Sequence, residues 1–363
     1  MSADNNQTIA PGGVIGILGG GQLGRMTAMA AARLGYRVHT YCPDHDCPAS
    51  HVSWKTTVAA YDDLAALKGF AESVDVVTFE FENIPAETTE LLADLKPTRP
   101  KPRVLYLTQE RLREKHFLAS INVPTTKFLE VAHAEALPQA VQALGRPSIL
   151  KSARFGYDGK GQVRIDTDTD LADAWKKMGG DLGILERFVD FAKEISVMVA
   201  RGPDGAIALY VPVENQHKHH ILDVTYAPAR VNSTVIARAE AIARHIAQEI
   251  DLVGILGVEM FVTQSGDVLV NELAPRPHNS GHWTIDACVT SQFEQFVRAV
   301  CGLPLGSTER HSDAIMKNLI GADIDAWRDL LADPGVKLHL YGKTEARPGR
   351  KMGHYTKLSA RSD

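Results

Sequence analysis

The stretch that decides the fold is Gly257–Trp283, which reads GVEMFVTQSGDVLVNELAPRPHNSGHW. Two runs rich in Val, Leu, Met and Phe flank the turn signal Gln264–Asp267, and this pattern predicts a β-hairpin with Ser265 and Gly266 at its tip. A loop of two or four residues gives the facing pairs Thr263 and Val268, Phe261 and Val270, and Glu259 and Glu272. A loop of three or five residues would break this register.

The two glutamates of this hairpin are the first candidate functional residues. Side chains alternate along a strand, so Glu259 and Glu272 would lie on one face, directly opposite each other. Like charges in that position destabilise a hairpin, and a bound divalent cation would compensate. Oxygen ligands, with Asn271 beside them, favour Mg²⁺ or Mn²⁺ over Zn²⁺. The alternative is a pair of glutamates on a solvated strand face.

The composition is that of an ordinary globular protein. The length of 363 residues indicates two to three domains, and the net charge of −5 gives no reason to expect nucleic acid or an anionic membrane as a partner. No apolar run approaches the roughly 18 residues that span a bilayer, and the polar start Met1–Gly13 is unlike a signal peptide. The four cysteines are sparse for this length, which favours reduced thiols in a cytoplasmic protein.

The N-terminal region alternates strands and helices. Strands are expected at 14–18, 36–42 and 74–79, with helices at 22–34 and 62–72, an order that predicts a parallel, doubly wound, Rossmann-like sheet. The proline-rich stretch 96–103 indicates a boundary, and Thr108 is expected to cap a helix over 109–120. Further strands (147–152, 183–188, 194–200) and helices (169–178, 233–250) predict an α+β region.

A glycine motif follows the first predicted strand. Gly19, Gly21 and Gly24 satisfy the dinucleotide fingerprint, with Asp44 about 20 residues further on, and taken alone they predict a dehydrogenase. The physical content is more general, because glycines let backbone N–H groups and a helix N-terminus approach any phosphate. The ligand is therefore open between a dinucleotide and a sugar phosphate. Gln22 stands where a hydroxyl or phosphate oxygen would come close.

The stretch Phe79–Asn83 closes the third predicted strand. Ligands of open α/β sheets bind beyond the carboxyl ends of the strands, so Glu80 and Asn83 are expected near the glycine motif. A carboxylate there suits a ribose hydroxyl or an amine. The alternative is a helix-capping or solvated pair.

A lysine and a glycine-rich loop follow in the middle of the chain. Lys151 ends an apolar strand, where a cation is costly without an anionic partner. The loop Phe155–Gln162 (FGYDGKGQ) is flexible enough to fold over a polyphosphate with backbone donors. It lacks the spacing of a P-loop. The alternatives are a surface lysine and a plain hairpin turn.

Several of these motifs together resemble the ATP-grasp ligases. The run Asn-Glu-x-Ala-Pro-Arg-x-His-Asn-Ser-Gly-His-Trp at 271–283 is similar to one member family, the 5-(carboxyamino)imidazole ribonucleotide synthases of purine biosynthesis. The family order is also matched by the glycine motif, Lys151 with its loop, and four polar stretches: Phe79–Asn83, Glu186–Glu194, Glu214–His217 and Arg347–His354. The resemblance extends from about residue 14 to 354.

The resemblance implies a role for each matched residue. The implied ATP site comprises Arg111, Lys151, Gly156, Tyr157, Asp158, Gly159, Lys160, Gly161, Gln162, Glu186, Arg187, Phe188, Val189, Glu194, His217, Asn271 and Glu272. The implied ribonucleotide site comprises Gly20, Gly21, Gln22, Leu23, Glu80, Asn83, Tyr157, Arg276, His278, Asn279, Ser280, Arg350 and Lys351. The implied metal ligands are Glu259 and Glu272, and the implied catalytic groups are Arg276, Lys151, His278 and Asp158.

The implied fold has three parts. These are a Rossmann-like substrate-binding domain (1–107), an ATP-grasp region in two subdomains with a flap at about 155–162 (108–304), and a small C-terminal domain (305–363). The implied reaction joins bicarbonate to the amine of 5-aminoimidazole ribonucleotide through carboxyphosphate, with ATP as co-substrate and Mg²⁺ or Mn²⁺ as cofactor. The family resemblance also implies a homodimer.

Two other functions fit part of the sequence. One is a different ATP-grasp ligase that uses another carboxylate, such as formate with glycinamide ribonucleotide, or a relative of biotin carboxylase. The form of the loop 275–283 disfavours it. The other is a non-catalytic nucleotide-binding module built on the glycine motif, and an intact glutamate pair with Lys151 disfavours that.

Overall fold

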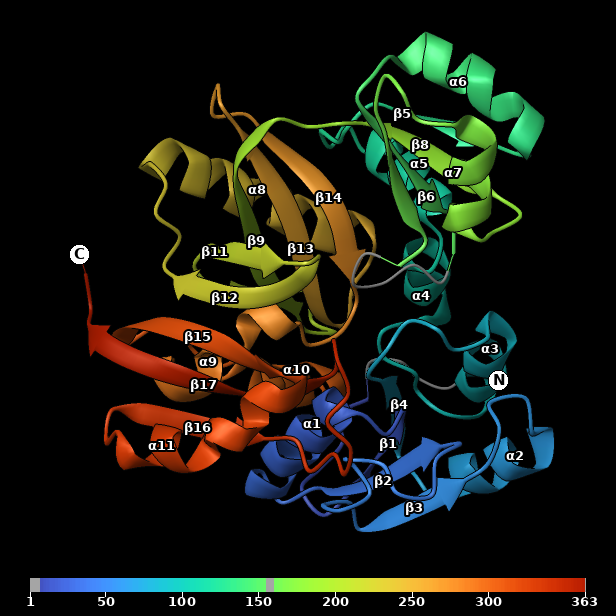
Figure 1. The fold of residues 1–363 in the computed structure, drawn as a ribbon. Coiled ribbons are helices and arrows are strands. Elements are labelled where there is room, and N and C mark those ends of the chain that lie inside the picture. The colour runs from blue at the N-terminus through green and yellow to red at the C-terminus, as the bar shows by residue number, and fades with distance from the viewer. Residues whose placement is uncertain (1–6, 155–159, 363) are drawn as a thin grey trace.

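The computed structural model describes residues 7–154 and 160–362. The N-terminal part is a parallel sheet in the order β3-β2-β1-β4, as the alternation of elements predicted (Figure 1). Its strands are β1 (Val14–Leu18), β2 (Arg37–Cys42), β3 (Lys55–Val58) and β4 (Val76–Phe79), and its helices are α1 (Gln22–Arg33), α2 (Leu64–Glu72), α3 (Ala86–Leu95) and α4 (Pro102–Thr108). The sequence analysis did not anticipate β3, α3 or α4.

The proline-rich stretch 96–103, where a boundary was predicted, is packed against this sheet. Thr98 bridges to Val77 in the parallel sense, and the fully buried Arg99 donates to the carbonyl oxygens of Val300 and Gln7, both at 2.7 Å. The expected cap at Thr108 is wrong. Thr108 is the last residue of α4, and Glu110 is the N-cap of α5 (Arg111–Ser120).

A small antiparallel sheet in the order β5-β8-β6-β7 follows. It consists of β5 (Phe128–Val131), β6 (Ser148–Ser152), β7 (Gln162–Ile165) and β8 (Gly183–Arg187), and η1 (Ala134–Ala136), α6 (Leu137–Leu144) and α7 (Leu171–Met178) accompany it. Apolar residues of α6 and α7 share a core with β5, β6, β7 and β8. This unit stands at the upper right in Figure 1.

The largest sheet has nine strands, eight of them in the order β14-β13-β9-β11-β12-β15-β17-β16, with β10 paired to β9. They are β9 (Phe191–Arg201), β10 (Ile207–Leu209), β11 (Val213–Lys218), β12 (Ile221–Ala227), β13 (Gly254–Thr263), β14 (Val268–Ala274), β15 (Ser312–Ile320), β16 (Val336–Leu340) and β17 (Lys351–Ala360). The last three strands come from the C-terminal region, so that region continues the central sheet (Figure 1).

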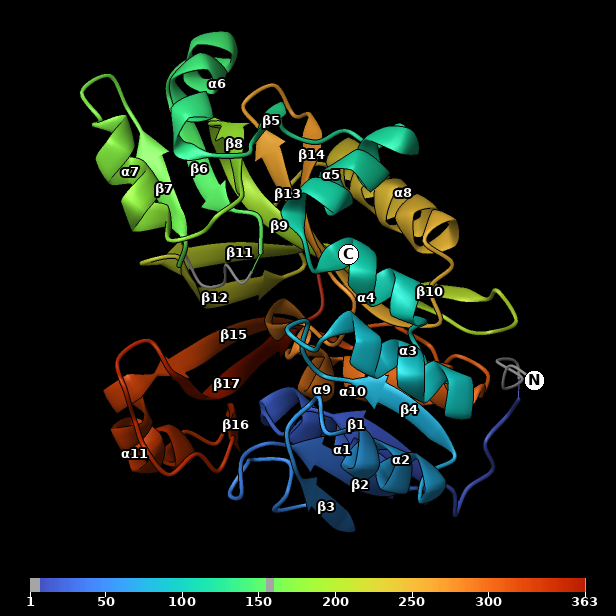
Figure 2. The same ribbon diagram turned by 90° about the vertical axis from the view of Figure 1, so that its right-hand side faces the viewer.

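Helices cover both faces of this large sheet. Val197 and Val199 of β9 share a core with α8 (Ser233–Glu249), whereas the alternate residues Met198 and Ala200 share one with α10 (Gln292–Cys301). Helix α10 also packs against α1, which joins the N-terminal part to the sheet (Figure 2). The remaining elements are η2 (Asn279–Gly281), α9 (Thr284–Ala287), η3 (Gly321–Ala326) and α11 (Trp327–Ala332).

A search for membrane-spanning segments over the described residues finds no helix with the length and apolar character to cross a bilayer.

Candidate active site

The hairpin of β13 and β14 places the two glutamates opposite each other, as predicted, but its loop length and strand register differ from those expected. Thr263 donates its N–H to the oxygen of Asp267, so the connection holds three residues, and Met260 pairs with Val270. The predicted pairs Phe261 with Val270 and Thr263 with Val268 are therefore wrong by one residue. A bulge at Asn271 adds one residue to β14 and restores the pairing of Glu259 with Glu272.

Each glutamate of the pair has a basic side chain beside it. His278 Nε2 lies 2.9 Å from Glu259 Oε1, and Arg111 donates to Glu272 Oε2 at 3.0 Å. Burial opposes the charged form of Glu259, yet His278, with His217 and Arg276 behind it, outweighs burial and holds the pKa of Glu259 below its usual range. Protein groups thus balance the like charges in this structure, a compensation that the sequence analysis assigned to a metal.

The oxygen atoms around the bulge fit a hard divalent cation. The side-chain oxygen of Asn271 is buried and lacks a hydrogen-bond partner among the residues the structure describes. Asn271 precedes Glu272 in β14, and its oxygen together with the two carboxylates gives an all-oxygen set that suits Mg²⁺ or Mn²⁺. The same described residues contain no cluster of three or more His, Cys, Asp or Glu that could hold a metal on their own. A cation here would therefore need further oxygens from a ligand.

Lys151 lies in a buried charge network between the small sheet and α5. Its ammonium donates to Glu186 Oε2 at 2.6 Å, and Lys115 Nζ lies 3.6 Å from Glu186 Oε1. Burial would raise the pKa of Glu186, but Lys151 and Lys115 outweigh it and hold that pKa at about 2. The strand lysine thus has its anionic partner within the protein, and Glu186 fixes where the ammonium lies.

The segment after Glu186 connects the small sheet to the large one. Strand β8 ends at Arg187 and β9 begins at Phe191, so Phe188 and Val189 form the link. At the start of β9, Glu194 Oε2 lies 2.7 Å from His217 Nδ1 on the neighbouring strand β11. Burial would lower the pKa of His217, but the hydrogen bond and charge of Glu194 raise it. The predicted residues Glu194 and His217 therefore contact each other within the large sheet.

The predicted flap joins β6 to β7. Lys151 pairs with Gln162, and Ser152 donates its N–H to the oxygen of Gly161 at 2.7 Å, so the two ends of the flap meet. Gln162 Nε2 lies 3.3 Å from the ring of His220, in the turn between β11 and β12. The predicted residues Gly156, Tyr157, Asp158 and Gly159 lie outside the described residues, whereas Lys160, Gly161 and Gln162 lie within them.

The glycine motif forms the N-terminus of α1, but the structure gives two of its N–H groups a protein partner. Gly21 and Gly24 donate to the two carboxylate oxygens of Glu80, the second at 2.8 Å. Burial raises the pKa of Glu80, while these two bonds oppose the rise. Glu80 thus occupies donors that were expected to hold a phosphate, because helix N-termini attract carboxylates as well. Asn83 lies exposed, and Leu23 is buried.

The loop after β14 brings Arg276 and His278 to the boundary between the parts. Arg276 Nε lies 2.7 Å from Glu82 Oε1, a contact with the N-terminal region. Both ring nitrogens of His278 have partners, since Nδ1 lies 2.8 Å from Ser280 Oγ and Nε2 faces Glu259. A proton could reach His278 only after one of these contacts is released.

Two predicted residues of this loop are held by other side chains. The amides of Asn279 and Asn318 bond reciprocally at 2.9 and 2.8 Å. Ser280 is fully buried against Ser196, with an oxygen–oxygen distance of 2.6 Å, so any part it plays runs through its neighbour His278.

The basic C-terminal turn forms as the sequence indicated. Arg350 donates its N–H to the oxygen of Arg347, and Gly349 has a φ of 78°, the conformation that position i+2 of a type II turn requires. The segment before this turn approaches α1, the helix that follows the glycine motif. A side chain at Gly342 would touch Arg25 of α1, and the charge of Lys343 acts on Glu80.

Sequence reasoning missed several residues of the site. These are Glu114 and Lys115 of α5, Glu82, Gln292 and Lys343. Arg-x-x-Glu-Lys at 111–115 did carry a signal, because charges spaced by three and four residues share one face of a helix. The other three depend on contacts between distant segments.

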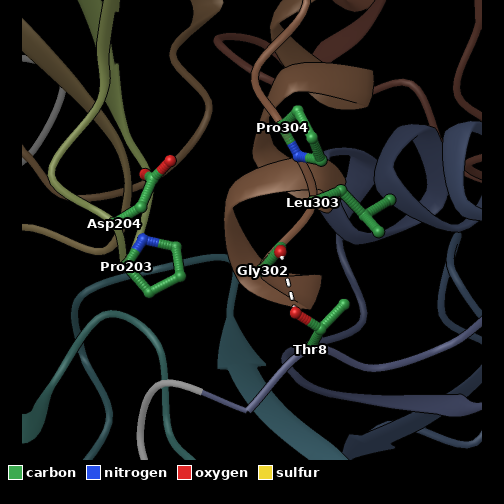
Figure 3. A pocket seen from close by; sticks show the side chains of 6 residues that line it. All are labelled: Thr8, Pro203, Asp204, Gly302, Leu303 and Pro304. Carbon is green, nitrogen blue, oxygen red and sulfur yellow. Dashed lines mark hydrogen bonds between the residues drawn. The ribbon is translucent and has the colours of Figure 1, made fainter.

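A surface hollow of about 260 Å³ lies away from these residues. Figure 3 shows its lining, in which Thr8 donates to the oxygen of Gly302 at 3.2 Å, with Pro203, Asp204, Leu303 and Pro304 around it. Asp204 is its one charged lining residue, and none of the predicted site residues lines it.

Three family models match the chain. They are the ribonucleotide synthetase preATP-grasp domain (residues 13–109), the ATP-grasp domain (116–293) and the phosphoribosylaminoimidazole carboxylase C-terminal domain (314–363). The N5-carboxyaminoimidazole ribonucleotide synthase of Brucella melitensis is 46% identical, over 98% of this chain and 99% of that protein. The chain belongs to the N5-carboxyaminoimidazole ribonucleotide synthase family.

Solved structures agree with this membership. An N5-carboxyaminoimidazole ribonucleotide synthetase in complex with ADP superposes with a TM-score of 0.95 at 43% identity, covering 97% of this chain and 94% of that one. The Aspergillus clavatus synthase with ADP and 5-aminoimidazole ribonucleotide gives 0.91 at 31% identity, covering 96% and 94%. The chain also matches, at 47% identity over 96% of its length, 37% of the bifunctional purine synthesis protein of Dictyostelium discoideum. The expected fold class and ATP-dependent ligase activity are thereby confirmed.

Proposed function

We propose that the described side chains form the site at which this chain carboxylates the amine of 5-aminoimidazole ribonucleotide with bicarbonate, at the cost of one ATP. The activity follows from family membership, and the assignment of residues is our proposal. The observation that carries the assignment is the glutamate pair at the Asn271 bulge, next to Arg111 and the Lys151 network. Carboxylates and cations are there held within a few ångströms, as phosphoryl transfer requires.

The first step joins bicarbonate to the γ-phosphoryl group of ATP. A bicarbonate oxygen attacks phosphorus, the bond to the bridging oxygen breaks, and ADP leaves carboxyphosphate behind. Glu259, Glu272 and the side-chain oxygen of Asn271 would hold Mg²⁺ or Mn²⁺, which would supply positive charge beside the phosphates. Lys151, fixed by Glu186, supplies a protein cation for the moving phosphoryl group.

The second step forms the carbon–nitrogen bond. The amine attacks the carbonyl carbon of carboxyphosphate, or CO₂ released from it, the bond from carbon to the phosphate oxygen breaks, and the amine loses a proton. Arg276, which Glu82 of the N-terminal part holds at 2.7 Å, would bind the departing phosphate. The proton acceptor is His278, once it leaves Glu259, or Asp158. A closing flap at 155–162 would keep water from the intermediate.

The ribonucleotide is proposed to lie between α1 and the C-terminal turn. Backbone groups of Gly20–Leu23 and the cations Arg350 and Lys351 would hold its phosphate, and Lys343 is added because its charge reaches Glu80. Glu80 would then release the N–H groups of Gly21 and Gly24 to the phosphate, or bind the ribose. The approach of Gly342 to Arg25 supports this placement.

An assay of ADP release separates this function from its rivals. Release should require both bicarbonate and the aminoimidazole ribonucleotide, and formate with glycinamide ribonucleotide should give none. Release with the second pair would assign a different ligase, and a bare nucleotide-binding module would release no ADP.

A homodimer and a cytoplasmic location are also proposed. The four cysteines are free thiols, which suits a reducing compartment. The molar mass measured by light scattering at several concentrations tests the dimer. A mass equal to that of one chain at every concentration would contradict it.

A further inference from the structure

The bulge at Asn271 decides whether the glutamate pair exists. From Met260 toward the turn, β13 and β14 pair so that Met260 faces Val270. If that register continued without the bulge, Glu259 would face Asn271, and Glu272 would face Val258 on the opposite side of the sheet. The one extra residue is therefore what brings both carboxylates to the same face.

Two side chains of helix α5 form hydrogen bonds to the backbone at this bulge, from the outer edge of β14. Lys115 Nζ donates to the oxygen of Asn271 at 2.9 Å and approaches the oxygen of Val270 at 3.3 Å. One residue earlier on the helix, Glu114 Oε2 accepts the N–H of Leu273 at 3.0 Å. The two side chains thus bind the backbone on both sides of Glu272. Figure 2 shows α5 beside β14.

The hydrogen bond from Lys115 replaces one that the bulge removes from the sheet. A bulged residue is left out of the regular ladder, so its carbonyl needs another donor. Lys115 provides one, and its side chain is itself held by Thr125 Oγ1 at 2.7 Å and by the carboxylate of Glu186 at 3.6 Å. Burying an ammonium is costly unless it is paired and hydrogen-bonded, and each of these partners meets that need.

Neither side chain is available to a ligand in this structure. Lys115 is 1% exposed and Glu114 is 3% exposed, whereas Glu272 is open enough to bind one. We propose that Glu114 and Lys115 are positioning residues for the metal site: they hold the β14 bulge, and through it the pairing of Glu272 with Glu259. This inference rests on the proposed function, because it concerns the affinity of that site for Mg²⁺.

The test substitutes Lys115→Met, which keeps the length of the side chain and removes its charge and donors. Mn²⁺ binding in the presence of ADP, measured by electron paramagnetic resonance, should weaken about 10- to 100-fold, the usual effect of losing a group that orients a metal ligand. The Mg²⁺ concentration for half-maximal ADP release should rise by a similar factor. At saturating Mg²⁺, the KM for ATP should stay near that of the unchanged protein.

Two further variants separate positioning from general stability. Lys317→Met removes another paired lysine, 2.7 Å from Asp223, on a strand separated from β14 by four others, and should leave metal binding unchanged. Glu114→Gln keeps an oxygen for the N–H of Leu273 and should retain most of the Mn²⁺ affinity, whereas Glu114→Ala should lose it. If Lys115→Met does not fold, the comparison of Glu114→Gln with Glu114→Ala serves as the test.

The outcomes are distinct. Unchanged Mn²⁺ affinity in Lys115→Met, or equal affinities in Glu114→Gln and Glu114→Ala, would overturn the inference. A rise in the KM for ATP that persists at saturating Mg²⁺ would overturn it too, because it would mean that Lys115 acts on the nucleotide. If the unchanged protein releases ADP without any divalent cation, the proposed function fails instead.

Discussion

Replacing Glu272 by Gln tests the metal site with little disturbance of the fold. The substitution removes the like-charge opposition to Glu259, a gain of about 0.2–1 kcal/mol. It also removes one ion-pair partner of Arg111, 3.0 Å away, and a pair in which Glu272 is 39% exposed contributes only about 0.2–1 kcal/mol. The two effects are of similar size and opposite sign. The melting temperature should therefore shift by less than about 4 °C.

Turnover should respond quite differently to the same change. Loss of a group that merely orients a metal ligand costs 10- to 100-fold, so the loss of a charged ligand should lower Mg²⁺-dependent ADP release by at least about 100-fold. Both quantities are measured on one preparation, by differential scanning fluorimetry and a coupled ADP assay. Asp267→Asn is the matched control, because it removes a carboxylate of the same hairpin that pairs with Arg238, and it should keep near-normal turnover. Near-normal turnover in Glu272→Gln would refute the metal assignment.

Three more predictions follow from the proposed sites. Arg350→Ala should raise the KM for the ribonucleotide roughly 10- to 100-fold, because a charge-assisted hydrogen bond contributes about 1.5–3 kcal/mol. A rise in the KM for ATP instead would show that the C-terminal turn does not bind the ribonucleotide. The aminoimidazole ribonucleotide should raise the melting temperature and NADH should not; tight NADH binding in a fluorescence titration would restore the dehydrogenase interpretation of Gly19–Gly24. Because Glu194 raises the pKa of His217, their pair stabilises the fold fully below the unfolded pKa of about 6.5 and loses its effect as pH rises through the raised value. The stability lost in Glu194→Gln should therefore be largest below about pH 6.5, and a loss that grows with pH would contradict this pairing.

The hairpin shows both the strength and the limit of the sequence analysis. The facing of Glu259 and Glu272 was predicted correctly, yet the assumed loop was wrong, and a bulge at Asn271 cancelled the error. Nothing local in the sequence marks that bulge. Its supports, Glu114 and Lys115, lie 159 and 156 positions before the residues they bind, and only the tertiary fold brings them to β14.

Other differences have the same origin. The parallel N-terminal sheet was predictable because its strands and helices are local and strongly patterned. The position of Glu80 on the N–H groups of Gly21 and Gly24 was not, since a carboxylate and a phosphate are equally suited to a helix N-terminus. Nor could the sequence show that β15 and β17 continue the central sheet, because strand pairing over such separations leaves no periodic signal.

The most direct test of the central claim follows an oxygen atom. Bicarbonate labelled with ¹⁸O is incubated with the protein, Mg²⁺, ATP and 5-aminoimidazole ribonucleotide, and the inorganic phosphate is analysed by mass spectrometry. If bicarbonate attacks the γ-phosphoryl group, one labelled oxygen should appear in the phosphate for each ADP released. Phosphate that carries no label while ADP is released would contradict the proposed reaction.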